Sequence, residues 1–312
     1  MAVEDELARF TPEKDTALTI GVFDGVHLGH KQLITELTRQ ANHDNLLSGV
    51  VTFRQHPEDV LSGGKKLPFL TDIATRINLL REAGADFVVP LTFSAELAGM
   101  DAKTFMALLQ KHLKMRRLII GPDFALGKER KGNIESLTEL GKVTGFKVTV
   151  VPPLKINGKV VSSTAIRQAM AEGDMEEYRA LTGRSFSLHG KVVSGAGRGG
   201  GLGFPTANLD IKKGQAIPPD GVYCGEAHIN GSTFQAMTNI GRNPTFGENE
   251  RTIESFLLSY SGDLYGRELT VDFVSRLRDE KKFNNIEELK KQVADDVKRG
   301  KAILGSRDNT AS

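Results

Sequence analysis

The sequence is poor in cysteine, in net charge and in long hydrophobic runs. Its single cysteine, Cys224, excludes an intrachain disulfide and a zinc site made of several thiolates, which suits a reducing compartment. The 41 basic and 39 acidic residues leave a net charge of only +2, so no overall field attracts nucleic acid or an anionic membrane. No apolar run approaches the roughly 20 residues that a membrane helix requires.

These absences leave selective binding to local sites. The N-terminal segment, MAVEDELARFTPEKD, is too highly charged for a signal peptide. We therefore expect a soluble, cytoplasmic protein with no nucleic-acid partner and no membrane partner, and the sequence leaves self-association open. With 312 residues, 39% of them hydrophobic, the chain can form more than one core, so we expect two domains.

Short apolar runs alternate with segments of helical spacing in the first half of the chain. This alternation predicts parallel βαβ units, with helices on both faces of the sheet. The predicted strands are 17–23, 49–53, 85–91, 117–121 and 147–151, and the predicted helices are 30–41, 71–84, 101–114 and 163–183. The last of these helices is expected to stop at Gly183.

The second half changes to short alternating segments joined by turns rich in glycine, asparagine and proline. This pattern predicts an antiparallel barrel or sandwich, with strands at 186–193, 221–229, 232–240, 254–260 and 267–274. A final helix is expected over 285–304, where Asn285 and Glu288 fit a capping box. Its apolar stripe, expected to pack on the barrel, consists of Ile286, Leu289, Val293 and Val297.

The stretch GVFDGVHLGHKQLI follows the first predicted strand and opens a helix. Open parallel sheets bind anions at such places, because backbone amides and the helix dipole point at the ligand. His27 and His30 stand one helical turn apart and can face the same oxygens. The glycines that let the backbone approach a phosphate are Gly21, Gly25 and Gly29. A phosphate cradle is favoured over a metal pair, which lacks a third ligand. For this motif taken alone, ordinary turn and core histidines stay an open alternative.

A second polar cluster precedes the last helix of this half. In VSSTAIRQAM, hydroxyls from Ser162, Ser163 and Thr164 lead into the helix, and Arg167 follows one turn later. Alone, such a run is most often a helix cap. Together, HxGH and SSTxxR resemble nucleotidyltransferases that transfer AMP or CMP from a nucleoside triphosphate. The segment GPDFALGKERKGN between them has the wrong spacing for a P-loop.

The glycine-rich segment GRGGGLGFPTANL lies in the all-β half. Gly195, Gly197 and Gly200 spell GxGxxG, but no helix follows, so a dinucleotide fingerprint is rejected. A flap over phosphates, followed by Thr206 and Asn208 as oxygen ligands for Mg²⁺, explains the residues better. A flexible hairpin loop is the alternative.

From about residue 15 to residue 304 the chain resembles the bifunctional bacterial FAD synthetases, in which riboflavin kinase is joined to FMN adenylyltransferase. The matching segments occur in the same order along the chain: GVFDGVHLGH, TFRQHP, GPDFALGKERKG, SSTAIR, GFPTANL, DGVY, NIGRNPTFG, IESFLL, GDLYG and RLRDEKKF. Two departures are Val22, where asparagine is common, and Ser259, where an acidic residue is frequent. Neither removes a catalytic group.

The resemblance implies a fold and a reaction sequence. Residues 1–182 would form a Rossmann-like nucleotidyltransferase domain, and residues 183–305 a six-stranded antiparallel β-barrel with a C-terminal helix, followed by a tail over 306–312. The barrel would phosphorylate riboflavin with ATP and Mg²⁺ to give FMN. The first domain would transfer AMP from a second ATP to FMN, giving FAD and pyrophosphate. The alternatives are a monofunctional nucleotidyltransferase and a non-enzymatic flavin-binding protein.

The resemblance also implies residue roles. Glu254 would be the base for the riboflavin hydroxyl, and Thr206 and Asn208 would hold the metal. His27 and His30 would stabilise the transition state of adenylyl transfer, and Ser163, Thr164 and Arg167 would hold the leaving pyrophosphate. For Phe53 and Phe124, core packing is the favoured interpretation and flavin contact is the alternative. The expected nucleotide- and phosphate-binding residues are Gly21, Phe23, Asp24, Gly25, Gly29, Asp123, Ser162, Ser163, Thr164, Arg167, Gly199, Gly203, Pro205 and Thr206.

Overall fold

The computed structural model describes residues 2–61, 67–194, 206–211, 214–242 and 251–308. Contacts divide the chain into two compact units, Met1–Ser163 and Thr164–Ser312. The division falls at the start of the last helical segment of the first half. The predicted boundary between residues 182 and 183 stays a prediction. No helix among the described residues is long and apolar enough to cross a membrane.

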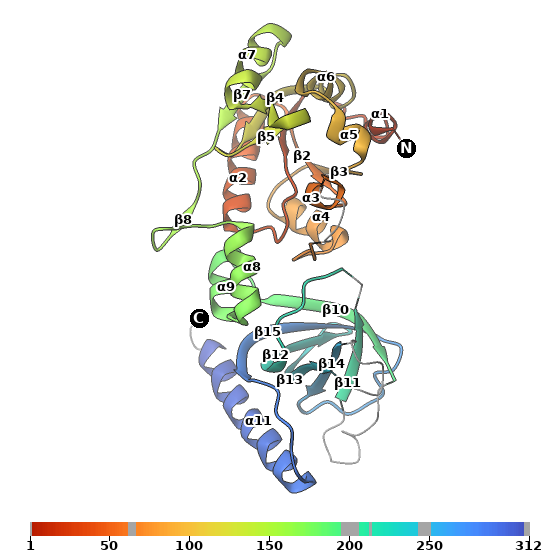
Figure 1. Cartoon of the computed structure of the whole chain (residues 1–312), viewed down its shortest axis with the longest axis vertical. Helices are drawn as coiled ribbons and strands as arrows, with labels where there is room; N and C mark the ends of the chain where they lie inside the picture. The colour runs from red at the N-terminus through yellow and green to blue at the C-terminus, as the bar shows by residue number, and fades with distance from the viewer. Residues whose placement is uncertain (1, 62–66, 195–205, 212–213, 243–250, 309–312) are drawn as a thin grey trace. The chain divides into compact units, whose positions relative to one another are not determined.

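The first unit contains a five-stranded parallel sheet of order β3-β2-β1-β4-β7 (Figure 1). Its strands are β1 (Thr16–Ile20), β2 (Leu47–Phe53), β3 (Phe87–Leu91), β4 (Met115–Ile120) and β7 (Lys147–Val150). The helices are α1 (Val3–Leu7), α2 (Leu28–His43), α3 (Pro57–Leu61), α4 (Ile73–Glu82), α5 (Ala95–Gly99), α6 (Ala102–Leu113) and α7 (Ile134–Thr144). Two small hairpins complete the unit: β5 (Ala125–Leu126) with β6 (Gly132–Asn133), and β8 (Lys155–Ile156) with β9 (Lys159–Val160).

Both faces of this sheet are buried, as the near-continuous apolarity of the strands predicts. Leu18 and Ile20 of β1 belong to a core that includes buried residues of α1, α6 and α7. Ala17, which points to the other face, belongs to a second core with residues of α2 and α4. The predicted parallel α/β class of the first half is therefore confirmed.

The second unit is a closed antiparallel barrel of order β10-β11-β14-β13-β12-β15, which confirms the fold predicted for the second half (Figure 1). The strands are β10 (Phe186–Val193), β11 (Thr206–Ile211), β12 (Gly221–Ile229), β13 (Ser232–Arg242), β14 (Arg251–Leu257) and β15 (Glu268–Arg278). The pattern of apolar runs did not indicate β11, because polar residues occupy one of its faces. The helices are α8 (Ser163–Glu172), α9 (Met175–Thr182) and α11 (Ile286–Asp308).

The helix expected over 163–183 is two helices. Gly173 adopts a left-handed conformation with φ of 74° and ends α8, and Asp174 caps α9 by accepting a hydrogen bond from the amide of Glu177. Gly183, with φ of 73°, ends α9 as predicted. A side chain at Gly173 would also meet the Arg276 side chain at 2.8 Å.

Helix α11 lies along the barrel and contacts β12, β13 and β15 (Figure 1). Half of the predicted capping box is present, since the amide of Glu288 donates to Oδ1 of Asn285. The Glu288 carboxylate accepts from the amide of Asn284, one residue before the predicted position. The predicted apolar stripe is wrong at its first member, because Ile286 is 58% exposed. The contact lies further along the helix, where Leu304 is buried with Val297 and Ile303 beside it.

Candidate active sites

The histidine motif lies at the carboxyl end of β1, where the order of the sheet reverses. The chain passes from β1 to β2 on one side, whereas β4 flanks β1 on the other. Ligands of open α/β sheets bind in the crevice at such a switch point. The loop 21–27 follows β1 there and leads into α2, and Asp123 follows β4.

His27 and His30 cap each other's backbone. His27 is the N-cap of α2, and its Nδ1 accepts a hydrogen bond from the amide of His30 at 3.1 Å. Nδ1 of His30 accepts a longer bond, 3.4 Å, from the amide of His27. The rings stack with centroids 3.5 Å apart and an interplanar angle of 15°. Because each Nδ1 is an acceptor, the proton of a neutral ring is on Nε2, so both rings are donors at Nε2.

The turn before His27 is held in an unusual backbone conformation. Phe23, Gly25 and Val26 have φ of 52°, 80° and 35°. Positive φ suits glycine but is strained for phenylalanine and valine, so the surroundings must hold the turn. Phe23 is buried and meets the His30 ring edge-on at 5.0 Å. At Gly29 a Cβ would lie 3.1 Å from Nδ1 of His27, so glycine leaves room for the ring there.

Asp24 is almost fully buried and fixes this turn. Its Oδ1 accepts hydrogen bonds from the amides of Leu70 at 3.0 Å and Thr71 at 3.2 Å. The Thr71 hydroxyl in turn accepts from the amide of Gly25. The backbone oxygen of Asp24 accepts from the Ser163 hydroxyl at 3.0 Å, which brings the SST segment beside the turn.

Three further residues of this network were not found from the sequence. The Arg76 guanidinium is fully buried, 3.7 Å from the Asp24 carboxylate, and the His56 ring is 3.6 Å from the same carboxylate. Both side chains pack on the Phe69 ring, His56 stacked at 4.0 Å and the Arg76 Cζ at 4.4 Å from its centroid. The TFRQHP match includes His56, but nothing in the sequence indicated Arg76 or Phe69.

The SST segment spans the division between the two units. Ser162 and Ser163 belong to the first unit, whereas Thr164 and Arg167 belong to α8 of the second. Ser163 is the predicted phosphate-binding hydroxyl that the structure joins directly to the histidine turn, through its bond to the Asp24 backbone.

An apolar cavity of about 500 Å³ lies in the first unit at the same end of the sheet. Phe53, Phe93 and Phe124 line it, with Gly21 and Asp123 among the lining residues. Ligand sites of cofactor enzymes are mostly apolar cavities of this size with a few polar groups at defined places. The candidates Phe53 and Phe124 thus both border an open space.

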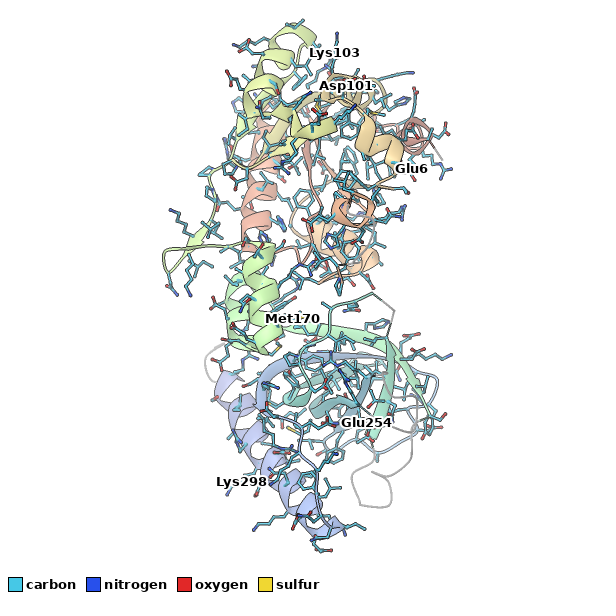
Figure 2. The ribbon with its side chains drawn as sticks, in the orientation of Figure 1. Glu6, Asp101, Lys103, Met170, Glu254 and Lys298 are labelled. Atoms are coloured by element: carbon cyan, nitrogen blue, oxygen red, sulfur yellow. The ribbon has the colours of Figure 1, made fainter. Side chains whose placement is uncertain are left out.

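The barrel brings the second group of candidates together on adjacent strands. Asn208 of β11 pairs directly with Glu254 of β14, and Glu254 pairs with Asn239 of β13. Directly opposed residues share a face of the sheet, so the three polar side chains form a row. The Thr206 hydroxyl donates to Oε2 of Glu254 at 3.5 Å. Figure 2 shows Glu254 on the barrel. Asn239 lies in the NIGRNPTFG match but was not selected from the sequence.

The residues of the predicted glycine flap lie outside the described part of the chain. These are Gly199, Gly203 and Pro205, and Thr206 is the first described residue after them.

The DGVY segment anchors the barrel rather than contributing an exposed group. The Asp220 carboxylate binds Arg251 at 2.7 Å, and Arg276 donates to the Asp220 backbone oxygen. The Tyr223 hydroxyl donates to the backbone oxygen of Pro219, and burial raises the pKa of Tyr223 to about 12.

The metal interpretation of the two histidines gains no support. Among the described residues, the one group of three or more side chains arranged to hold a metal ion is Glu226, His228 and Asp272. This group lies on β12 and β15 of the barrel and includes neither His27 nor His30.

Comparisons with known proteins assign both halves. Residues 10–165 match the FAD synthetase family model, and residues 182–304 match the riboflavin kinase family model. The bifunctional riboflavin kinase/FMN adenylyltransferase of Escherichia coli K12 is 34% identical over 94% of each chain. The chain belongs to this family. That of Bacillus subtilis is 33% identical over 90% of each chain. The predicted family and its two activities are confirmed, and the monofunctional and non-enzymatic alternatives are set aside.

A solved structure shares the fold of this bifunctional family over nearly its whole length. It is a crystal structure from Streptococcus pneumoniae described as a macrolide-efflux protein. It is 30% identical, covers 94% of this chain and 95% of its own, and aligns with a TM-score of 0.88. A protein with the same fold has therefore been seen in an experimental structure.

Proposed function

We propose that His27 and His30 stabilise the transition state of adenylyl transfer by donating hydrogen bonds from their Nε2 atoms. An oxygen of the FMN phosphate forms a bond to the α-phosphorus of ATP, and the bond from that phosphorus to the bridging oxygen breaks as pyrophosphate leaves. Negative charge is redistributed over the phosphate oxygens. Neutral imidazoles whose Nε2–H groups are fixed beforehand stabilise this charge without having to reorganise.

The neighbouring groups hold the rest of the nucleotide. Gly21, Gly25 and Gly29 let the backbone approach the phosphates, and Ser162, Ser163, Thr164 and Arg167 bind the leaving pyrophosphate. Phe23 and Asp24 act through the turn, because both are buried and bonded within the protein. Asp123 borders the cavity and contributes a polar contact to the nucleotide.

The apolar cavity receives the flavin ring of FMN. Its aromatic lining, from Phe53, Phe93 and Phe124, offers flat surfaces for a planar ring. Its position at the carboxyl end of the sheet, with Gly21 in its lining, would put the FMN phosphate near the histidine turn.

In the barrel, Glu254 accepts the proton of the riboflavin ribityl hydroxyl, whose oxygen then bonds to the γ-phosphorus of ATP while ADP leaves. Thr206 and Asn208 offer hard oxygen ligands, which fit Mg²⁺. The hydrogen bond of Thr206 to Glu254 and the pairing of Asn208 with Glu254 support this assignment. Bound Mg²⁺ would neutralise phosphate charge. Gly199, Gly203 and Pro205 lie outside the described residues, and we expect them to bind the phosphates of ATP.

Several wider expectations belong to the same proposal. We expect Mg²⁺-dependent turnover in the cytoplasm, no nucleic-acid partner, and a kinase domain that begins near Gly183. Self-association remains an open property of the chain.

One observation carries the proposal: the reciprocal caps of His27 and His30, in which each Nδ1 accepts an amide, so that the proton of each neutral ring is on Nε2. The test is a time course with riboflavin, ATP and Mg²⁺, analysed by chromatography of flavins. FMN should appear first and FAD after it. Product that stops at FMN, at every ATP concentration and in either flavin redox state, would contradict adenylyl transfer.

A further inference from the structure

Arg76 is a buried cation that lies behind the adenylyltransferase site. It comes from α4, and no part of its side chain is exposed. Burial lowers the pKa of its guanidinium, with Asp24 and then Asp72 opposing that shift. Its Nε has no hydrogen-bond partner. An arginine this deep cannot touch a substrate, so any effect it has on the reaction must pass through the groups that it holds.

The groups that Arg76 holds surround the histidine turn. Nη1 donates to the backbone oxygens of Val22 at 3.1 Å and Phe53 at 2.8 Å. Nη2 donates to the backbone oxygen of Thr71 at 3.1 Å. One planar guanidinium thereby joins the start of the turn, the end of β2 and the segment that binds Asp24. A compact ammonium group does not match three such acceptors in this fork.

The turn between these anchors needs such support. Phe23 and Val26 have positive φ, a backbone conformation that is strained for residues other than glycine. Val22 immediately precedes this strained turn, and the Thr52 hydroxyl is the other donor to its backbone oxygen. The backbone oxygen of Thr71 accepts a hydrogen bond from Arg76. The Thr71 amide donates to Asp24, and the Thr71 hydroxyl accepts from the amide of Gly25. The position of His27, which ends the turn, depends on both anchors.

Stability alone does not explain a charge at this place. Replacement of a buried ion pair by apolar residues of similar volume is often neutral or stabilising. Arg76 stays beside Asp24 at 3.7 Å even though one guanidinium nitrogen is unsatisfied. What Arg76 contributes is a fixed geometry, since its rigid guanidinium holds three separate backbone segments together.

We propose that Arg76 is a positioning residue for adenylyl transfer, which sets the turn 22–26 so that the Nε2 atoms of His27 and His30 face the reacting phosphates. The proposal rests on the role assigned above to these two histidines. It predicts that the shape of the guanidinium, and not only its charge, is required for the chemical step of FAD synthesis. Riboflavin phosphorylation in the barrel does not depend on it.

The first experiment measures both activities of the full chain carrying Arg76→Lys. Lysine keeps a charge for Asp24 but loses the fork. We expect kcat for FMN to FAD to fall about 10- to 100-fold, as for a catalytic group misplaced by about 1 Å. KM for FMN and ATP should stay within about twofold, because binding is not affected. Arg81→Lys on the exposed part of the same helix is the matched control and should change neither activity.

The second experiment adds Arg76→Lys to the variant that carries both His27→Ala and His30→Ala. If Arg76 acts through the two histidines, the triple variant should be no slower than the variant without either histidine, because both groups that Arg76 positions are already gone. Losses that multiply, or a wild-type kcat in folded Arg76→Lys, would overturn the proposal. Should Arg76→Lys not fold, Asp24→Asn with Arg76→Met removes both charges and is judged by the same two criteria. Normal FAD synthesis by a His30→Ala variant would contradict the assigned histidine roles and the Arg76 proposal with them. Loss of FAD synthesis in His30→Ala together with normal FAD synthesis in Arg76→Lys would contradict only the Arg76 proposal.

Discussion

Nδ1 of His27 accepts the amide of His30, and Nδ1 of His30 accepts the amide of His27, so each histidine caps the backbone of the other. This arrangement reconciles two interpretations that compete at the level of sequence. The δ nitrogens accept hydrogen bonds as ordinary helix caps do, and the ε nitrogens carry the protons that the proposed catalytic role requires. The structural role and the proposed catalytic role would therefore use opposite edges of the same rings.

The two roles separate in the variants His27→Asn and His27→Ala. Asparagine is a strong N-cap and should keep the melting temperature, whereas alanine should cost about 0.5–2 kcal/mol of stability. Both should slow FMN-to-FAD conversion about 10²–10³-fold, because both lose the Nε2 donor. Near-normal FAD synthesis by a stable His27→Asn protein would show that the imidazole serves only as a cap.

The metal-ligand role proposed for Asn208 predicts a change in the Mg²⁺ dependence of riboflavin phosphorylation. Asn208→Ala should slow riboflavin phosphorylation and raise the Mg²⁺ concentration that gives half-maximal rate, because one oxygen ligand is lost. The Mg²⁺ dependence of adenylyl transfer in the same protein should not move and is the control. Slow phosphorylation at an unchanged Mg²⁺ requirement would argue that Asn208 binds substrate instead.

The packing of Tyr178 of α9 indicates which C-terminal fragment of the chain should be the more stable. This residue is almost fully buried and packs edge-on against Phe186 at 5.5 Å. A fragment 183–312 loses that ring, whereas 164–312 keeps it. We expect both fragments to phosphorylate riboflavin and the longer one to have the higher melting temperature, since loss of a buried aromatic side chain destabilises a core. Equal melting temperatures would mean that α9 is not part of the barrel's core.

Cys224 reports on the contact between α11 and the barrel. Burial raises the pKa of its thiol from 9.0 to about 11, and Gly300 of α11 lies directly over it. Because the folded state holds the proton more tightly, this group contributes stability below pH 9, which is lost as the pH rises towards 11. At pH 8 the thiolate fraction is about a hundredfold lower than in the unfolded chain, so alkylation should be at least that much slower. Alkylation at the unfolded rate in native buffer would show that α11 does not cover the thiol.

Local patterns were enough to predict most of the fold. The strands of the first half were readable because their apolar residues are consecutive, as burial on both faces requires. The break after α8 was also present in the sequence, as a glycine followed by an aspartate cap, but the helical spacing on both sides concealed it. The burial of Ile286, the first residue of α11, was predicted wrongly. Periodicity shows which face of a helix is apolar, but it does not show how much of the helix length packs on the barrel.

Candidate site residues could be predicted where they belong to a motif of characteristic residue types. They were missed where their partners are backbone groups. His27, Asn208 and Glu254 belong to recognisable motifs. Arg76 bonds to the backbone oxygens of Val22 and Phe53, 54 and 23 positions away, and backbone oxygens leave no trace in a sequence. Asn239 became visible only through its register opposite Glu254.

If one chain has a separate site for each activity, each site can be disabled alone. Flavin chromatography tests this on two reciprocal variants, His27→Ala with His30→Ala, and Glu254→Gln, each supplied with ATP, Mg²⁺ and either riboflavin or FMN. We expect the histidine variant to convert riboflavin to FMN and to stop there, and we expect Glu254→Gln to leave riboflavin unchanged but to convert supplied FMN to FAD. Loss of both activities in either folded variant, or of neither in both, would contradict this assignment of the two sites.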